Sequence, residues 1–260
     1  MTSPAALLAF ADTLADAARA AILPFFRAAH QLENKASAGF DPVTEADRAA
    51  EAAMRALIEA HYPDHGISGE EFGEKPSMDG HIWALDPIDG TRAFIAGLPL
   101  WGVLIGLSYR GAPLIGVMDQ PYLGERFRGW PGGADLVTRD GVRPLSTRPC
   151  ADLGDAIAAT TDPFLFQGAE RDAFERVRAR AKLTRYGCDC YAYCMVAAGS
   201  IDLVIESGLK THDIAALIPI IAGAGGRVTT WDGGDALPGG RILACGDARA
   251  GDAAMALLRR

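Results

Sequence analysis

A chain of 260 residues, of which 49% are hydrophobic and 22% charged, has ample material for a folded core, so we do not expect a disordered protein. The formal net charge of −8, with no stripe of Lys and Arg, argues against nucleic acid and against an anionic membrane surface as partners. No apolar run is long enough to span a bilayer, and the N-terminus lacks the basic segment of a secretory signal.

The number and spacing of the cysteines indicate whether the protein lies in a reducing or an oxidising cellular compartment. Five are present, an odd number, and Cys188, Cys190 and Cys194 crowd together, whereas a secreted disulfide scaffold would space and pair its cysteines. No fourth ligand follows at a spacing usable for zinc, so buried thiols explain this run better than a zinc site. We therefore expect a reducing, cytoplasmic location.

In chain order, the first segments predict two helices. Pro4 follows a serine that can cap a helix, and apolar residues recur at helical spacing as far as Phe25. After a loop at 35–40, Thr44 can cap a second helix, with the carboxylate of Asp47 at the third helical position as in a capping box. Judged alone, that aspartate is best explained as a capping residue.

The most informative stretch of the sequence comes next. Residues 82–85 form an apolar run that predicts a short buried strand, and this strand ends at Asp86 and Asp89, with Pro87 between them. Because the proline fixes φ, the two carboxylates and the Ile88 carbonyl can converge on one side of a tight bend, as hard oxygen ligands for Mg²⁺. An ordinary surface turn explains the bare Asp-Pro-x-Asp-Gly pattern about equally well.

Gly90 and Thr91 follow this bend, and we expect them to begin a helix. The free N–H groups and the positive dipole of a helix N-terminus suit an anion. One short stretch would then offer oxygen ligands to a cation and hydrogen-bond donors to a phosphate. Without further context, the Thr91 hydroxyl is better explained as a group that stabilises the start of a helix.

The architecture is predicted to change along the chain. Strands and turns alternate between residues 101 and 130, as in an antiparallel sheet, whereas strands and helices alternate after residue 157, as in an α/β half. In this second half we expect strands at 157–161, 183–186, 201–206, 228–231 and 242–245, a loop at 207–211, helices at 169–181, 191–198 and 214–222, and a last helix that runs to residue 260.

Asp213 opens the helix predicted at 214–222, which is apolar on nearly every side and must be deeply buried. A carboxylate in the first turn compensates the helix dipole, which is a structural reason for an aspartate here. A carboxylate at the dry end of a core helix also needs a partner, and a cation would supply one.

One protein family carries a similar motif. The sequence Trp83-x-x-Asp86-Pro87-Ile88-Asp89-Gly90-Thr91, preceded by Gly69-Glu70-Glu71, resembles the signature of the inositol monophosphatase family of Mg²⁺-dependent phosphomonoesterases. The resemblance implies the layered α/β/α/β/α sandwich of mixed α/β class that this family is known for, also described as the inositol monophosphatase / fructose-1,6-bisphosphatase fold. It further implies a single domain over residues 1–260, with sub-lobes at about 1–150 and 151–260, a small phosphomonoester substrate and a homodimer.

Four converging carboxylates would need neutralisation. Like charges about 4 Å apart repel by roughly 4 kcal/mol per pair at an effective dielectric near 20, so protons or divalent cations must lie among them. A set of oxygen ligands favours Mg²⁺ or Mn²⁺ over zinc. The resemblance implies that Glu70, Asp86 and the Ile88 carbonyl hold one ion. Asp86, Asp89 and Asp213 would hold a second, and the site would take roughly two or three Mg²⁺ ions, with Mn²⁺ as a possible substitute.

The resemblance also implies catalytic roles. Asp47, Glu70 and Thr91 would be the catalytic residues, and the Thr91 hydroxyl would relay between the attacking water and Asp47. The phosphate would bind to the amides of Gly90 and Thr91. No serine, cysteine or histidine nucleophile is needed for this chemistry.

Other segments are similar to the histidinol-phosphatase branch of the family, and the similarity covers essentially the whole chain. These segments are Gln120 to Phe127, Thr184 to Tyr193, Glu206 to Lys210 with Asp213 to Leu217, and Thr230 to Gly234. The branch implies hydrolysis of L-histidinol phosphate, a reaction of histidine biosynthesis. The residues facing the alcohol portion of the substrate would be Arg185, Gly187, Cys188, Asp189 and Glu206. His212 stands where inositol-specific members typically have Trp.

Two of these residues also have plain structural explanations. Asp189 can be a helix N-cap and Glu206 an acid at the surface end of a strand. Histidinol phosphate carries an ammonium and an imidazole beyond its phosphate, whereas inositol phosphate carries only hydroxyls. A pocket for the former should place carboxylates away from the metal ligands, which is the role that we expect for these two acids.

Two rival functions remain open. An inositol-1-monophosphatase or another small sugar-phosphate phosphatase would use the same metal ligands. A non-catalytic binding or regulatory protein is the alternative of a different class, because some family members also act on the transcription machinery. Retention of every expected carboxylate favours catalysis, and the lack of a basic patch argues against RNA contact.

Overall fold

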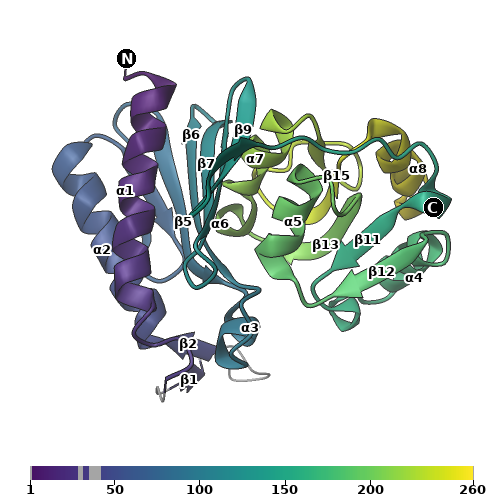
Figure 1. Cartoon of the computed structure of the whole chain (residues 1–260), viewed down its shortest axis with the longest axis horizontal. Coiled ribbons are helices and arrows are strands. Elements are labelled where there is room, and N and C mark those ends of the chain that lie inside the picture. Colours follow the sequence, from purple (N-terminus) through teal and green to yellow (C-terminus); the bar gives the residue numbers. More distant parts are fainter. Residues whose placement is uncertain (1, 29–31, 35–41, 260) are drawn as a thin grey trace.

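The computed structural model describes residues 2–28, 32–34 and 42–259. Five layers follow one another across the molecule (Figure 1): a helix pair, an eight-stranded sheet, a middle layer of helices, a five-stranded sheet and a second helix pair. The predicted α/β/α/β/α sandwich of mixed class is therefore confirmed.

The first layer consists of α1 (Pro4–Ile22) and α2 (Glu45–His61). The start of α1 is as predicted, because the Ser3 side chain accepts a hydrogen bond from the amide of Ala6 at 3.2 Å. The loop predicted at 35–40 lies outside the described residues, and so does the side chain of Thr44. The capping role predicted for that threonine stays a prediction.

The large sheet has the strand order β10-β9-β8-β7-β6-β5-β3-β4. Its neighbours are antiparallel except for β3 and β5, which run parallel. The strands are β3 (Gly66–Gly69), β4 (Gly73–Lys75), β5 (His81–Asp89), β6 (Gly102–Tyr109), β7 (Ala112–Gln120), β8 (Glu125–Trp130), β9 (Gly133–Thr138) and β10 (Gly141–Pro144). The β6–β7 hairpin confirms the antiparallel arrangement predicted for the middle of the chain. A separate pair, β1 (Leu32–Asn34) and β2 (Pro42–Thr44), precedes α2.

The second sheet has the order β12-β11-β13-β15-β14, with β11 parallel to both of its neighbours. Its strands are β11 (Ile157–Thr160), β12 (Leu183–Tyr186), β13 (Leu203–Leu209), β14 (Arg227–Thr230) and β15 (Gly240–Cys245). The helices around it are α4 (Ala169–Arg178), α5 (Asp189–Ala197), α6 (Thr211–Ile214), α7 (Leu217–Gly223) and α8 (Ala248–Leu258), of which α5, α6 and α7 lie between the two sheets (Figure 1). The α/β alternation predicted for this half is confirmed.

The strand of the aspartate motif is longer than expected. It does not end at residue 85 but continues as β5 to Asp89, and its pairing with β6 shifts register between Asp86 and Asp89. Pro87 lies at this irregularity, since it has no N–H to donate to a neighbouring strand. As expected, a helix follows at once, α3 (Thr91–Ile95).

Two predictions near Asp213 were wrong. The segment 207–211 is mostly strand rather than loop, because β13 extends to Leu209. The helix predicted at 214–222 is split into α6 and α7, and Asp213 belongs to the first of them. Pro219 accounts for the break, because it lacks the N–H that would bond to the carbonyl of Ala215 in a continuous helix.

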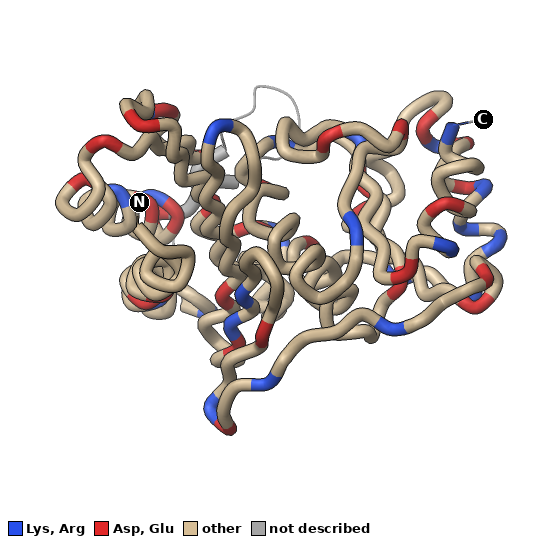
Figure 2. The backbone as a smooth tube through the Cα atoms, turned by 90° about the horizontal axis from the view of Figure 1, so that it is seen from above, with Lys and Arg blue, Asp and Glu red and all other residues tan. Residues whose placement is uncertain are grey.

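One hydrophobic core joins the two sheets through the middle helices. It includes Met118 and Phe127 of the large sheet, Val204 and Ile242 of the small sheet, and Ile220 of α7, all fully buried. Basic and acidic residues are interspersed along the chain (Figure 2). Within the described residues, no helix combines the length and the apolar character that a bilayer crossing requires.

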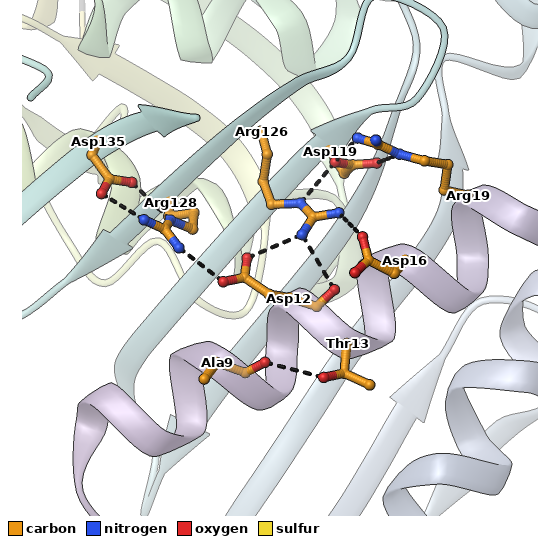
Figure 3. Close-up of polar contacts among 9 residues, drawn as sticks. All are labelled: Ala9, Asp12, Thr13, Asp16, Arg19, Asp119, Arg126, Arg128 and Asp135. Carbon is orange, nitrogen blue, oxygen red and sulfur yellow. Dashed lines mark hydrogen bonds and ion pairs between the residues drawn. The ribbon is translucent and has the colours of Figure 1, made fainter. Parts of the chain in front are cut away.

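A network of charged side chains fastens α1 to the large sheet (Figure 3). Asp119 of β7 is fully buried, and it accepts hydrogen bonds from Arg19 Nη2 at 2.7 Å and from Arg126 Nε at 2.8 Å. Arg128, two residues along β8, bridges Asp12 of α1 and Asp135 of β9. Arg126 and Arg128 point to the same side because side chains alternate along a strand.

Asp119→Ala is expected to lower the free energy of unfolding by about 3 kcal/mol or more, because it leaves two arginines without their shared buried carboxylate. The matched control is Asp16→Ala, since Asp16 also binds Arg126 but its side chain is 68% exposed. We expect a loss of less than about 1 kcal/mol for the control. Urea denaturation of both variants measures the difference, and equal losses would contradict the importance of burial.

Candidate active site

The carboxylates predicted to bind metal come together at the end of β5. Asp86, Asp89 and Asp213 each offer a ligand atom within 4.8 Å of the other two. Glu70, Asp86 and His212 form a second group of the same kind, and Asp86 belongs to both groups. Segments far apart in the sequence therefore converge, because β3 and β5 are parallel neighbours and α6 packs against β5 and β6.

The carboxylates of this cluster need neutralisation. Burial raises the pKa of Asp86 well above its ordinary value, and the charges of Glu70 and Asp89 raise it further. The pKa of Asp89 is likewise raised, first by burial and then by Asp189 and Asp213. Carboxylates in this position either take up protons or share a divalent cation. The oxygen-rich ligand set suits a hard cation.

A buried glutamate that the sequence analysis did not single out positions the Glu70 loop. Glu51 of α2 is fully buried and accepts hydrogen bonds from the amides of Glu71 at 2.7 Å and Phe72 at 3.1 Å. A Cβ atom at Gly69 would come within 1.9 Å of Glu51 Oε1, so a larger residue here would have to displace the Glu51 carboxylate from the loop amides. Glu51 and Gly69 together fix the loop on which Glu70 approaches Asp86.

The other residues with predicted catalytic roles lie around the same carboxylates. Asp47 is 3% exposed and close enough to Asp86 to raise its pKa. Thr91 begins α3, and its hydroxyl donates to the carbonyl of Ile88 at 3.1 Å. A carbonyl oxygen has two lone pairs, so this hydrogen bond leaves the Ile88 carbonyl free to bind a cation as well. Gly90, between them, has a φ of 86°, which favours glycine.

A pocket of about 200 Å³ opens beside the carboxylate cluster. Asp89, Asp213, Asp189 and Glu206 are among the side chains that line it. Burial raises the pKa of Glu206 to about 7, although the Thr161 amide donates to it at 2.6 Å. Burial also raises the pKa of Asp189 to about 6. The lining of the pocket is therefore acidic, although the charge of Arg92 partly offsets the effect of burial on the pKa of Asp189.

The other residues predicted to bind the substrate do not line this pocket. Arg185 is exposed on β12, Gly187 is exposed in the loop that follows, and Cys188 lies partly buried ahead of α5. Tyr193 is a lining residue that the sequence analysis missed. It is 3% exposed, and its hydroxyl has no hydrogen-bond partner among the described residues. Spacing along α5 could have indicated it, since Tyr193 lies one helical turn after Asp189.

A third group of possible ligands, His65, Asp79 and His81, lies near the other end of β5. Trp83 Nε1 donates to His65 Nδ1 at 3.0 Å. Because an indole N–H can only donate, the proton of the neutral His65 ring must be on Nε2, the nitrogen that faces Asp79 at 3.5 Å. A protonated nitrogen has no lone pair for a metal, so this group is a hydrogen-bonded anchor of β5 rather than a metal site.

Comparisons with known proteins agree with this geometry. A bifunctional phosphatase of Arabidopsis thaliana, the chloroplastic IMPL2, is 46% identical over 86% of this chain, which spans 64% of that relative's length. The histidinol-phosphatase of Chlorobaculum parvum is 38% identical, and the match covers 71% of each chain. A solved inositol monophosphatase from Zymomonas mobilis superimposes with a TM-score of 0.88 at 38% identity, and all of both chains is covered.

Histidinol-phosphatases are thus among the similar proteins, which supports the resemblance to that branch. The inositol monophosphatase family model matches residues 4–259, which is nearly the whole chain. This protein therefore belongs to the inositol monophosphatase family.

Proposed function

We propose that the protein is a Mg²⁺-dependent phosphomonoesterase that hydrolyses L-histidinol phosphate to L-histidinol and phosphate, in histidine biosynthesis. The observation that carries the proposal is the placement of Asp189 and Glu206, two mostly buried acids, in one pocket with Asp89 and Asp213. A phosphomonoester whose alcohol portion is cationic matches this arrangement, because its charge would neutralise the two acids.

The residues of the cluster fit Mg²⁺. Glu70, Asp86 and the Ile88 carbonyl would hold one ion and Asp86, Asp89 and Asp213 a second, all through oxygen. His212 lies with Glu70 and Asp86, but the oxygen ligands outnumber it. When bound, Mg²⁺ lowers the pKa of a coordinated water and neutralises the charge of the phosphoryl group. The pKa values of Asp86 and Asp89, raised first by burial and then by neighbouring carboxylates, support this proposal.

The chain's own residues would orient the reactants. The amides of Gly90 and Thr91 would donate to the phosphate. The Thr91 hydroxyl and the Asp47 carboxylate would hold the attacking water and receive its proton, with Glu70 completing the catalytic set. Hydrolysis forms one P–O bond from water and breaks the ester P–O bond, and the leaving alcohol oxygen takes up a proton.

The alcohol portion of the substrate would lie against α5 and the end of β13. Asp189 and Glu206 would face the ammonium, and a cation at this place would keep both acids ionised although burial raises their pKa values. The Tyr193 hydroxyl could donate to or accept from the same portion of the substrate. Arg185, Gly187 and Cys188 would shape the edge of the site.

The second candidate is a phosphatase for inositol phosphate or another sugar phosphate, since the solved structure from Zymomonas mobilis is named an inositol monophosphatase. A sugar phosphate offers hydroxyl groups but no cation to the two acids. The acidic lining therefore favours the cationic substrate.

Asp189→Asn and Glu206→Gln are each expected to lower kcat/KM for L-histidinol phosphate about ten- to a hundredfold, the equivalent of a charged hydrogen bond of about 1.5–3 kcal/mol. Hydrolysis of p-nitrophenyl phosphate, which has no ammonium, should change little. Steady-state kinetics with both substrates measures this selectivity.

Glu175→Gln is the matched control, because Glu175 is an acid of α4 that lies outside the pocket lining and pairs with Arg178 through a side chain that is 45% exposed. It should leave both substrates unaffected. Equal losses on both substrates in the two pocket variants, or a preference of the native enzyme for inositol phosphate, would favour the sugar-phosphatase alternative.

A further inference from the structure

Asp189 has a backbone conformation that is uncommon outside glycine, although aspartate adopts it more readily than most residues. Its φ is 42°, in the left-handed region that side-chain-bearing residues seldom adopt. Such a conformation costs free energy and persists only where the surrounding structure holds it. Because Asp189 is also the first residue of α5, its carboxylate points into the pocket only while the first turn of that helix keeps its place.

Contacts on the pocket side fix part of this turn. The amide of Cys190 donates to Asp89 Oδ2 at 2.7 Å, and the carboxylate of Asp189 accepts a hydrogen bond from Thr161. Gly90 lies beneath Asp189, and a Cβ atom at Gly90 would come within 3.2 Å of the Asp189 Cβ and Cγ atoms. These contacts place Asp189 directly against the end of β5, which carries the proposed metal ligands Asp86 and Asp89.

A contact on the opposite side comes from the large sheet. The hydroxyl of Tyr191 donates to Glu125 Oε2 at 2.5 Å, across 66 residues of sequence. Glu125 is the first residue of β8, and the ring of Tyr191 packs edge-on against Phe127 of the same strand, with ring centroids 6.0 Å apart. The hydrogen bond is partly buried, and burial together with the charge of Glu125 raises the pKa of Tyr191 above its ordinary value.

We infer that Glu125 and Tyr191 form a positioning pair that holds Asp189 in its strained conformation and thereby sets selectivity for cationic phosphomonoesters. This inference rests on the substrate contact of Asp189 in the proposed function. It also gives a role to the segment from Gln120 to Phe127, which resembles the histidinol-phosphatase branch but contributes no side chain to the lining of the pocket.

The effect should be confined to the alcohol portion of the substrate. Asp89 belongs to the nine-residue strand β5, which is paired with β6, so its backbone does not depend on α5. Asp189 is not part of a sheet, because it is the first residue of α5, and its position depends on contacts of the first helical turn. Loss of the pair should therefore move Asp189 while the metal-binding aspartates stay in place.

The test is Tyr191→Phe, which removes only the hydroxyl and keeps the ring against Phe127. We expect KM for L-histidinol phosphate to rise about three- to tenfold, whereas kcat for p-nitrophenyl phosphate stays within about twofold of the native value. Glu125→Ala should behave in the same way. Glu125→Gln, unlike Glu125→Ala, should keep KM close to the native value, because an amide oxygen can still accept a hydrogen bond from the Tyr191 hydroxyl.

The matched control is Tyr109→Phe, since Tyr109 lies at the end of β6 that pairs with the start of β5, away from the aspartates. This substitution should change neither KM for L-histidinol phosphate nor kcat for p-nitrophenyl phosphate. In an Asp189→Asn background, Tyr191→Phe should cause no further rise in KM, because both changes act through one carboxylate.

The possible outcomes distinguish failure of the positioning pair from failure of the proposed substrate. If Asp189→Asn impairs L-histidinol phosphate selectively and Tyr191→Phe leaves its KM unchanged, the positioning pair is refuted and the proposed substrate stands. Equal impairment of both substrates by Tyr191→Phe would also refute it, because a general loss of structure would then explain the effect. If Asp189→Asn itself has no selective effect, the substrate assignment fails.

Discussion

Asp86→Asn is expected to abolish phosphate release from every substrate while the protein remains folded. Asp86 belongs to both groups of converging ligands, so its loss removes one oxygen ligand from each proposed metal position. Phosphate release is measured across a Mg²⁺ titration, and excess chelator should abolish the activity of the native enzyme in the same assay. Full activity of the native enzyme in chelator would refute the metal-dependent mechanism.

The unfolding temperature of Asp86→Asn is the control that shows whether this variant remains folded. An acid whose pKa is raised in the folded state binds protons better there, so it destabilises the folded state once the pH exceeds the ordinary value of 3.8. Asparagine imitates the neutral carboxyl group. At neutral pH without metal, Asp86→Asn should therefore unfold at the same temperature as the native protein or at a higher one.

Asp202→Asn should give the opposite pattern. Asp202 is 1% exposed, binds Arg148 through two hydrogen bonds, and accepts from the amide of Ile157 at 2.7 Å. Its replacement should lower the unfolding temperature and leave kcat unchanged, because Asp202 belongs to neither ligand group. Together the two variants separate loss of a metal ligand from loss of a structural carboxylate.

The sequence could predict the parts of the site that lie within one short segment. Asp86, Ile88, Asp89 and Thr91 are separated by few residues, and an apolar strand followed by Pro and Gly leaves the chain little choice of conformation. The alternation of strands and helices in the second half was predictable for the same reason, since it depends on local periodicity. The extension of β5 to Asp89 was not, because a bulged strand and a turn share their residue types.

Contacts between distant segments could not be derived from local patterns. From the sequence alone, Glu51 looks like one of the exposed acids of α2. In the structure it is fully buried, because the loop that carries Glu70 packs against it. Asp189, with its left-handed φ, is followed by Cys190, whose amide donates to Asp89, a residue 101 positions earlier in the chain. Such features follow from contacts between segments that are distant in the sequence, and a linear sequence carries no periodic signal for them.

Thr91→Ala is expected to lower kcat by about 10²–10⁴, with little change in KM, as for a group that positions a proton transfer. The alternative role, a hydroxyl that caps α3, finds no support in the hydrogen bonds. The N-cap of α3 is Gly90, and the Thr91 hydroxyl donates backwards to the Ile88 carbonyl at 3.1 Å. This places the hydroxyl beside a proposed metal ligand, where it could pass a proton from the attacking water to Asp47.

The conservative variant Thr91→Ser decides between the two roles, because it keeps the hydroxyl and removes only a methyl group. We expect Thr91→Ser to retain kcat within about tenfold of the native enzyme, while both variants keep a similar unfolding temperature. A helix-start role predicts the reverse, a lower unfolding temperature for Thr91→Ala with kcat preserved at temperatures where the protein is folded. An unchanged kcat in Thr91→Ala would therefore remove this residue from the proposed proton path and leave Asp47 without its link to the water.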